Sequence, residues 1–202
     1  MKKINLTKIK LSILLLMMSV AYASCVTRLS TPTGIPEVSV SEYESIIESK
    51  TKKKEIYDGF YNQVTVEGTW LDSTVTEANL SHSARLFQWD EQKYKDEKTK
   101  AISKHSSSTE FFISFYTPER KQNDLSKPKS MWKIFLDING QRYEGKATKV
   151  KSSVSEVQVM YPYFNRWSVP YLVTFPVATA LTENKPASLT FTGAISTSQL
   201  KF

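Results

Sequence analysis

The side chains that perform most enzyme and metal chemistry are few and scattered along this chain. The sequence holds two histidines, His82 and His105, and one cysteine, Cys25, and these three are far apart. A zinc site needs three or four such ligands at recognisable spacing, so the sequence predicts no metal site. The carboxylate pairs at residues 90–91 and 96–97 fall in a charged stretch of helical periodicity, where adjacent side chains point in different directions. No serine lies in a nucleophile elbow. We therefore expect no enzyme and no cofactor.

The densest group of chemically useful side chains lies in residues 160–167. This segment holds four aromatic rings and one guanidinium around a proline. Such residues supply large, stiff contact area for a protein partner, or stack on a sugar ring. The alternative is that the rings close one end of a hydrophobic core, and exposure distinguishes the two. The candidate partner-binding residues are Tyr161, Tyr163, Phe164, Arg166 and Trp167.

The start of the chain has the pattern of an export signal. Four lysines precede the apolar residues 11–20, and the small residues Ala21, Ala23 and Ser24 follow, just before Cys25. A basic, then an apolar, then a small-residue region is typical of a secretory signal peptide. The apolar run is shorter than the ~20 residues that a membrane-spanning helix needs. We therefore expect the signal to be removed and the remainder of the chain to be exported.

The end of this signal, Ala23-Ser24-Cys25, resembles the lipobox of bacterial lipoproteins. The resemblance covers about the first 25 residues and implies that Cys25 becomes the first residue and carries fatty acids such as palmitate. Several such chains, each contributing ~0.8 kcal/mol per buried CH₂, make membrane attachment effectively permanent. Because Val26 and not aspartate follows the cysteine, the resemblance implies sorting to the outer membrane. Ala21-Tyr22-Ala23 is also an ordinary signal-peptidase site, and cleavage there would release a soluble periplasmic or secreted chain.

The basic charge of the chain comes largely from the signal. The net charge is +7, and without the signal's four lysines 23 basic residues face 20 acidic ones, a balance of +3. So mild a balance does not indicate a nucleic-acid partner. The lysine clusters at residues 50–54 and 146–151 would suit anionic lipid headgroups, but lysines late in a helix also complement its dipole. Because Cys25 has no second cysteine to pair with, burial of apolar side chains must hold the fold together.

The composition along the chain predicts three parts. Residues 1–24 are the signal peptide, residues 25–36 a Thr-, Ser- and Pro-containing tether, and residues 37–202 a single domain. A capping-box pair followed by an apolar stripe predicts a helix over residues 40–54. Amphipathic periodicity predicts a second helix over residues 76–100, whose second half is mostly solvated.

The rest of the chain has the patterns of β-strands. Asn139-Gly140 is a strong hairpin signal, because a type I′ turn needs positive φ at both central positions. Strands are predicted at residues 60–71, 110–116, 132–138, 141–149, 154–161, 169–177, 188–192 and 199–202. The polar residues 118–129 are expected to form a loop. Short strands at this spacing predict a mainly β fold, an antiparallel β-sandwich with a small α-helical N-terminal layer.

These observations lead to a functional expectation that depends on location more than on chemistry. We expect a lipoprotein of the cell envelope, anchored by Cys25 to the periplasmic or outer face of the outer membrane, that acts as a non-enzymatic binding or scaffolding module for another envelope protein. The alternatives are a carbohydrate-binding lipoprotein and a periplasmic glycan hydrolase. A hydrolase would need two carboxylates roughly 5 to 9 Å apart in one cleft.

Overall fold

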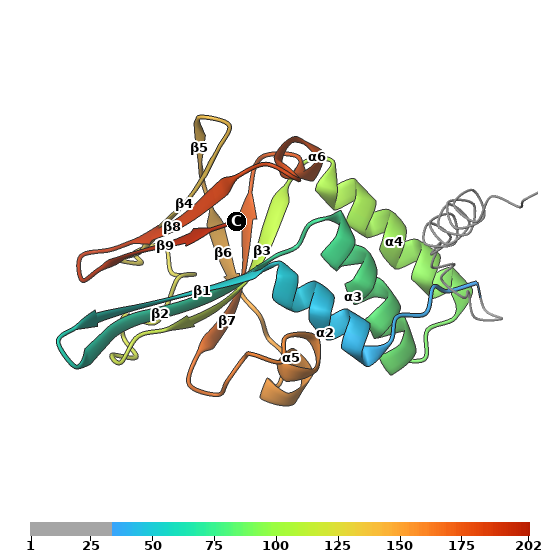
Figure 1. Cartoon of the computed structure of the whole chain (residues 1–202), viewed down its shortest axis with the longest axis horizontal. Coiled ribbons are helices and arrows are strands. Elements are labelled where there is room, and N and C mark those ends of the chain that lie inside the picture. Colours follow the sequence, from blue (N-terminus) through green and yellow to red (C-terminus); the bar gives the residue numbers. More distant parts are fainter. Residues whose placement is uncertain (1–33) are drawn as a thin grey trace, which may run out of the picture.

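A computed structural model describes residues 34–202 as three packed layers, namely a four-stranded sheet, a five-stranded sheet and a layer of helices (Figure 1). The predicted signal peptide, Cys25 and most of the predicted tether lie outside these residues. All neighbouring strands are antiparallel. The expected fold class, mainly β with a small helical part, is confirmed. Between residues 34 and 202, no helix is both long and apolar enough to cross a bilayer.

The five-stranded sheet has the order β1-β2-β3-β7-β6. Its strands are β1 (Thr51–Asp58), β2 (Tyr61–Trp70), β3 (Thr109–Tyr116), β7 (Val169–Phe175) and β6 (Lys146–Lys149). In β2, alternation buries Val64 and Val66 completely. The central strand β3 is apolar and buried on both faces, as its sequence predicts, because each face has a covering layer.

The four-stranded sheet has the order β5-β4-β8-β9, with strands β5 (Gln141–Glu144), β4 (Lys133–Ile138), β8 (Ala187–Thr192) and β9 (Thr197–Lys201). Asn139 and Gly140 join β4 to β5 at φ of 52° and 74°, so the predicted hairpin turn is confirmed. The single strand predicted over residues 141–149 is wrong, because the chain changes sheets at Gly145. A Cβ at this glycine would lie 2.5 Å from the ring of Phe175, so a side chain does not fit at the crossing.

The main core lies between the two sheets and is rich in aromatic rings. Phe111 is completely buried, and its ring centroid lies 5.4 Å from that of Trp70, 5.9 Å from Phe175 and 5.2 Å from Phe202. Phe202 also exchanges two backbone hydrogen bonds with Ala187, at 2.9 and 3.2 Å. The expectation that the C-terminus is paired in a sheet is therefore confirmed.

The helical layer covers the outer face of the five-stranded sheet. It consists of α2 (Val40–Ser49), α3 (Ser73–Leu86), α4 (Glu91–His105) and α5 (Val154–Met160), and a short turn, α6 (Thr179–Thr182), follows β7. Tyr43 joins three of these helices. Its ring stacks on that of His82 at 3.9 Å, and its hydroxyl contacts Asn79 Oδ1 at 2.7 Å and the Met160 carbonyl at 2.8 Å.

The first predicted helix, residues 40–54, is wrong beyond Ser49. Thr51 begins β1 instead, where it pairs with Thr69 of β2 while its hydroxyl donates to the Ile47 carbonyl at 2.7 Å. The lysines at residues 52–54 are exposed on this edge strand. Charged side chains on an edge strand oppose pairing with other chains, so the lysine run protects a sheet edge and does not end a helix.

Residues 76–100 form two helices and not the single one predicted. Gln88 adopts a φ of 50°, and its side chain donates to the Arg85 carbonyl at 2.8 Å, which ends the first helix. Asp90 Oδ1 then accepts a hydrogen bond from the Lys93 backbone N–H at 2.7 Å and caps the second. The helix end at Gln88 and the cap at Asp90 therefore divide a segment whose amphipathic pattern predicted one continuous helix.

The strand predicted at residues 154–161 is wrong, because this segment forms α5. Ser153 Oγ accepts from the Glu156 N–H at 3.2 Å, and the Glu156 carboxylate accepts from the Ser153 N–H at 2.8 Å. This capping box stabilises a helix start despite the β-branched residues that follow. As a result, the aromatic segment at residues 160–167 begins at the end of a helix and not at the end of a strand.

Candidate functional site

The aromatic segment at residues 160–167 divides into a buried and an exposed part. The ring of Tyr161 stacks on that of Phe112 at 3.6 Å with an interplanar angle of 1°, and Phe164 is only 3% exposed. Tyr163 packs beside them in the same cluster. These three side chains help cover the outer face of the five-stranded sheet and not an end of the sandwich. Their role in partner binding stays a prediction, and in this conformation their contacts lie within the fold.

Arg166 and Trp167 are the exposed part of the segment. The side chain of Trp167 is 70% exposed, which is unusual for so large an apolar residue. The Asn165 side chain accepts a hydrogen bond from the Trp167 backbone N–H at 3.0 Å, and this bond shapes the turn that presents the indole. Of the five candidate residues, these two face solvent.

Arg166 and Trp167 lie at one side of a cavity of about 530 Å³, which we call the basic cleft. The cleft is lined from three parts of the chain, namely residues 116–124 after β3, Lys149 at the end of β6 and residues 166–171 at the start of β7. The register of the sheet brings these parts together, because Phe115 pairs with Val169. Its volume is in the range of about 300–1,000 Å³ that is usual for small-molecule sites.

The charges around the basic cleft are unbalanced. Arg120, Lys149 and Arg166 line it, and among residues 34–202 none of the three forms a salt bridge or a side-chain hydrogen bond. Asp124 is the only carboxylate in its lining, and it already contacts Lys127 at 3.2 Å. Burial raises the pKa of Asp124, but hydrogen bonds from Ser126 and the hydrogen bond and charge of Lys127 together outweigh burial, and the net pKa is lowered. The carboxylate is therefore ionised and engaged, and the cleft carries a net positive charge.

The loop that forms one wall of the basic cleft is held by buried hydrogen bonds. The hydroxyl of Tyr171 donates to the Asn123 carbonyl at 3.0 Å and accepts from the Leu125 N–H at 3.2 Å. The indole of Trp132 donates to the Gln122 carbonyl at 2.8 Å. The predicted loop at residues 118–129 is confirmed as a segment without strands, and these bonds attach it to Tyr171 and Trp132.

Buried tyrosines should make the fold less stable at high pH. Burial raises the pKa of Tyr171 to about 12 and also raises the pKa values of Tyr43, Tyr161 and Tyr163. The unfolded chain loses these protons near pH 10.0, the ordinary pKa of a tyrosine hydroxyl, while the folded chain keeps them. The free energy of unfolding should therefore fall as pH rises above ~10. Urea unfolding monitored by tryptophan fluorescence should show a falling midpoint, with a smaller fall in Tyr171→Phe. A midpoint independent of pH would contradict this.

A second group of exposed aromatic residues lies at the turn between β1 and β2. Gly59, at a φ of 57°, and Phe60 are the two central residues of this turn, an arrangement typical of a type II′ hairpin. Phe60 is fully exposed, and Tyr57 and Tyr61 on either side are more than half exposed. We call these three residues the aromatic tip. It lies at the opposite end of the molecule from Gly34, where the described chain begins (Figure 1).

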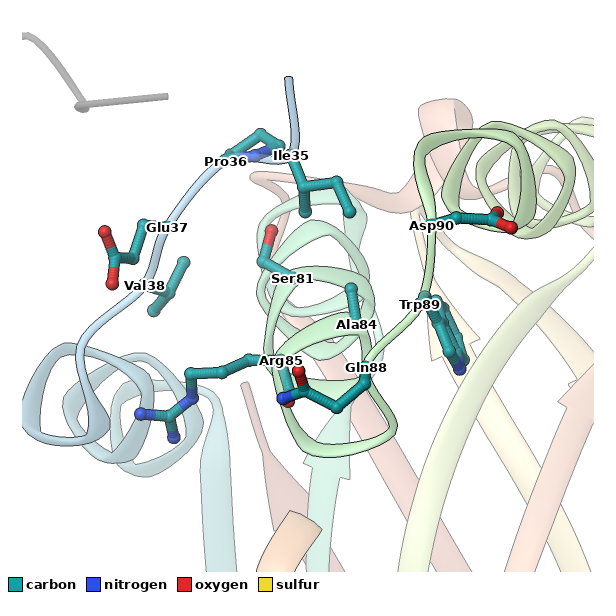
Figure 2. A pocket seen from close by; sticks show the side chains of 10 residues that line it. All are labelled: Ile35, Pro36, Glu37, Val38, Ser81, Ala84, Arg85, Gln88, Trp89 and Asp90. Atoms are coloured by element: carbon teal, nitrogen blue, oxygen red, sulfur yellow. The ribbon is translucent and has the colours of Figure 1, made fainter. Parts of the chain in front are cut away.

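A second cavity, of about 440 Å³, lies where the described chain enters the fold (Figure 2). Its walls come from residues 35–38, from α3 and from residues 88–90. Figure 2 shows the Asp90 carboxylate directed away from the cavity, in agreement with its use as the cap of α4. Ile35, in the last part of the predicted tether, is already buried against Ala84 and Tyr94. This cavity lies between the N-terminal segment and the helical layer, and its lining includes Glu37, Ser81 and Arg85.

The histidines lie in separate environments. His82 is buried beneath Tyr43, and burial lowers its pKa, as does the nearby Arg85. His105 Nε2 lies 3.1 Å from Thr76 Oγ1. Within residues 34–202, no three side chains of His, Cys, Asp or Glu are grouped so that they could hold a metal ion.

Sequence reasoning missed the aromatic tip and two of the three cations of the basic cleft. The tip has a sequence signal, since Asp58-Gly59 between aromatic residues favours a hairpin, but the helix predicted over residues 40–54 left no room for β1. Arg120 and Lys149 have no such signal, because they meet Arg166 only through the pairing of β3, β7 and β6.

Comparison with known proteins found no match to this chain among protein-family models, curated proteins or solved structures.

Proposed function

We propose that this chain is a non-enzymatic binding or scaffolding module that acylated Cys25 holds at the outer membrane of a bacterium, and that its partner is another envelope protein. The observation that carries this proposal is the aromatic tip. Phe60 is fully exposed at the apex of a hairpin, so its ring makes no contribution to the core. A phenylalanine in that position gains free energy only when another molecule covers it.

The chemistry of the tip favours a protein as the covering molecule. Aromatic side chains are enriched at the centres of protein interfaces, where each buries a large area with few rotatable bonds. Tyr57 and Tyr61 add hydroxyl groups beside the apolar ring of Phe60, and these groups suit the polar rim of such a contact.

The position of the tip suits a tethered module. The described chain enters the fold at the helical end, and the aromatic tip lies at the other end (Figure 1). A lipid anchor preceding Gly34 would therefore hold the domain by one end and present the tip at the other. Confinement to a thin layer beside the membrane raises the effective concentration of the tip near an envelope partner without any new contact.

The proposal is tested by photocrosslinking in intact cells that produce the full chain. A photoreactive residue at Phe60 should give one dominant adduct with another envelope protein. The matched control is Phe87, which is also exposed but lies at the end of α3, beside the N-terminal cavity, and should not give this adduct. Phe60→Ala should abolish co-purification of the crosslinked protein. Equal adducts from both positions, or none from Phe60, would count against the proposal.

Carbohydrate binding is the second candidate, and the observation that favours it is the basic cleft. Exposed Trp167 lines the same cleft as the amide of Asn123 and the carboxylate of Asp124, a combination that suits stacking on a sugar ring and hydrogen bonding to its hydroxyls. Glycan hydrolysis has less support, because Asp124 is the only carboxylate among the described residues that line this cleft and hydrolysis uses two. The alternative to membrane anchoring is a soluble periplasmic or secreted protein. Either location is compatible with a protein partner and with a carbohydrate ligand.

A further inference from the structure

Three cations share the basic cleft without partners of opposite charge. Arg120 comes from the loop after β3, Lys149 from the end of β6 and Arg166 from the segment before β7. Elsewhere in residues 34–202, ten lysines and arginines form salt bridges, for example Arg142 with Asp137 at 2.7 Å. Because like charges repel one another, gathering three unpaired cations around one cavity costs free energy that an anionic ligand would recover.

The remaining lining of the basic cleft suits a ring-shaped, hydroxyl-bearing molecule. Trp167 lines the cleft with a large, mostly exposed indole. Hydroxyl and amide side chains of Thr117, Asn123 and Ser168 add hydrogen-bonding groups to the lining. Asn123 is 92% buried, and its Oδ1 has no hydrogen-bond partner among the described residues. An isolated inorganic anion would use the cations but would leave the exposed indole and Asn123 Oδ1 without a contact.

We propose that the basic cleft binds an anionic saccharide, a sugar unit that bears a phosphate or a carboxylate group. Arg120, Lys149 and Arg166 contact the charged group, and Trp167 packs against the ring of the sugar. Arginine suits both anions, because its planar guanidinium donates two parallel hydrogen bonds to phosphate or carboxylate oxygens. This inference rests on the second candidate function, carbohydrate binding, and is independent of the aromatic tip and of the membrane anchor.

The test is a titration of the purified, isotope-labelled full chain followed by NMR, with the indole N–H signal of Trp167 assigned from a Trp167→Phe variant. Four probes are compared, namely glucose 6-phosphate, glucuronate, neutral glucose and inorganic phosphate. The first two should bind roughly tenfold more tightly than glucose or phosphate alone, because they combine the ring and the charge. Raising the salt concentration should weaken the binding of glucose 6-phosphate and of glucuronate.

Two double variants separate the role of the cleft from that of overall charge. The double variant Arg120→Gln with Arg166→Gln should bind glucose 6-phosphate roughly tenfold more weakly than the original protein and should bind glucose with unchanged affinity. The double variant Lys52→Gln with Lys54→Gln removes the same charge from the exposed edge strand β1 and should change the affinity for neither sugar. All four positions are exposed, so the fold is expected to survive each change.

The outcomes distinguish this inference from the function on which it rests. Equal binding of glucose and glucose 6-phosphate would overturn the requirement for charge and leave carbohydrate binding standing. Equal binding of phosphate and glucose 6-phosphate would overturn the role of the sugar ring. No shift of the Trp167 signal with any probe would overturn both the inference and the second candidate function.

Discussion

Replacing Cys25 with serine should move the protein from the detergent-rich to the aqueous phase when cells are extracted with a detergent that separates on warming. The expected change is close to complete. Each buried CH₂ of an acyl chain contributes ~0.8 kcal/mol, so several acyl chains hold a protein on a membrane. Without acyl chains, only the surface of the folded domain could bind the membrane. That surface is only mildly basic, since 23 basic residues face 20 acidic ones once the signal is removed.

The control for this experiment is Ser24→Ala, which keeps a small residue before the cysteine and should leave the protein in the detergent phase. Mass spectrometry of the mature chain adds an independent measurement, because acylation raises its mass by that of the fatty acids. A Cys25→Ser variant that still enters the detergent phase would contradict the anchor, as would a purified chain with a free thiol or one that begins at Ser24.

Replacing Phe111 with alanine should lower the free energy of unfolding by about 3–5 kcal/mol. Phe111 is completely buried between the two sheets, and the rings of Trp70, Phe175 and Phe202 surround it. Removing the ring loses its burial and leaves a cavity that these neighbours fill only in part. A loss of this size is a large fraction of the ~5–15 kcal/mol that usually stabilises a domain.

The matched control is Phe60→Ala, which removes the same atoms from a fully exposed position. Its free energy of unfolding should stay within ~0.5 kcal/mol of the original protein. Urea unfolding followed by circular dichroism measures both variants on one scale. A small loss for Phe111→Ala would contradict the placement of the core, and a large loss for Phe60→Ala would mean that the aromatic tip has a structural role. The same control also shows whether the Phe60 interaction variant is folded.

The start of the described chain and the two proposed contact sites occupy different parts of the molecule. The described chain begins at the helical end, whereas the aromatic tip lies at the far end of the β1–β2 hairpin (Figure 1). The basic cleft opens where β3 ends and β7 begins, and Thr65 of β2, near the hairpin turn, pairs with Tyr116 in the cleft lining. A module held by its helical end would thus present both sites away from its point of attachment.

Strands could be predicted where alternation and turn chemistry agree. The hairpin at Asn139-Gly140 follows from local sequence, because few residue pairs other than Asn-Gly adopt positive φ at both positions of a two-residue turn. The buried strand β3 also follows from local sequence, because its apolar residues lie on both faces of the strand. Residues 50–54 and 154–161 were predicted wrongly for the opposite reason. In the first, pairing with β2 outweighs a local helical pattern, and in the second a capping box outweighs β-branched residues.

The candidate site could be predicted only in part. The segment that holds Arg166 and Trp167 stands out in the sequence by its density of rings, but its division into buried and exposed side chains depends on the packing of Tyr161 and Phe164 against β3. Arg120 and Lys149 are ordinary surface residues in the sequence. They become part of one site because strands β3, β7 and β6 are neighbours in the sheet.

The sequence by itself determined the features that depend on a few consecutive residues. These are the export pattern before Cys25, the turn at Asn139-Gly140, the alternation of buried strands and, from them, the mainly β class. The tertiary structure alone decided which aromatic residues are buried, where the chain changes sheets at Gly145, and which cations share a cleft. The physical reason is range, since turns, caps and alternation act over a few residues, whereas burial and the meeting of charges depend on residues that are distant in sequence and close only after folding.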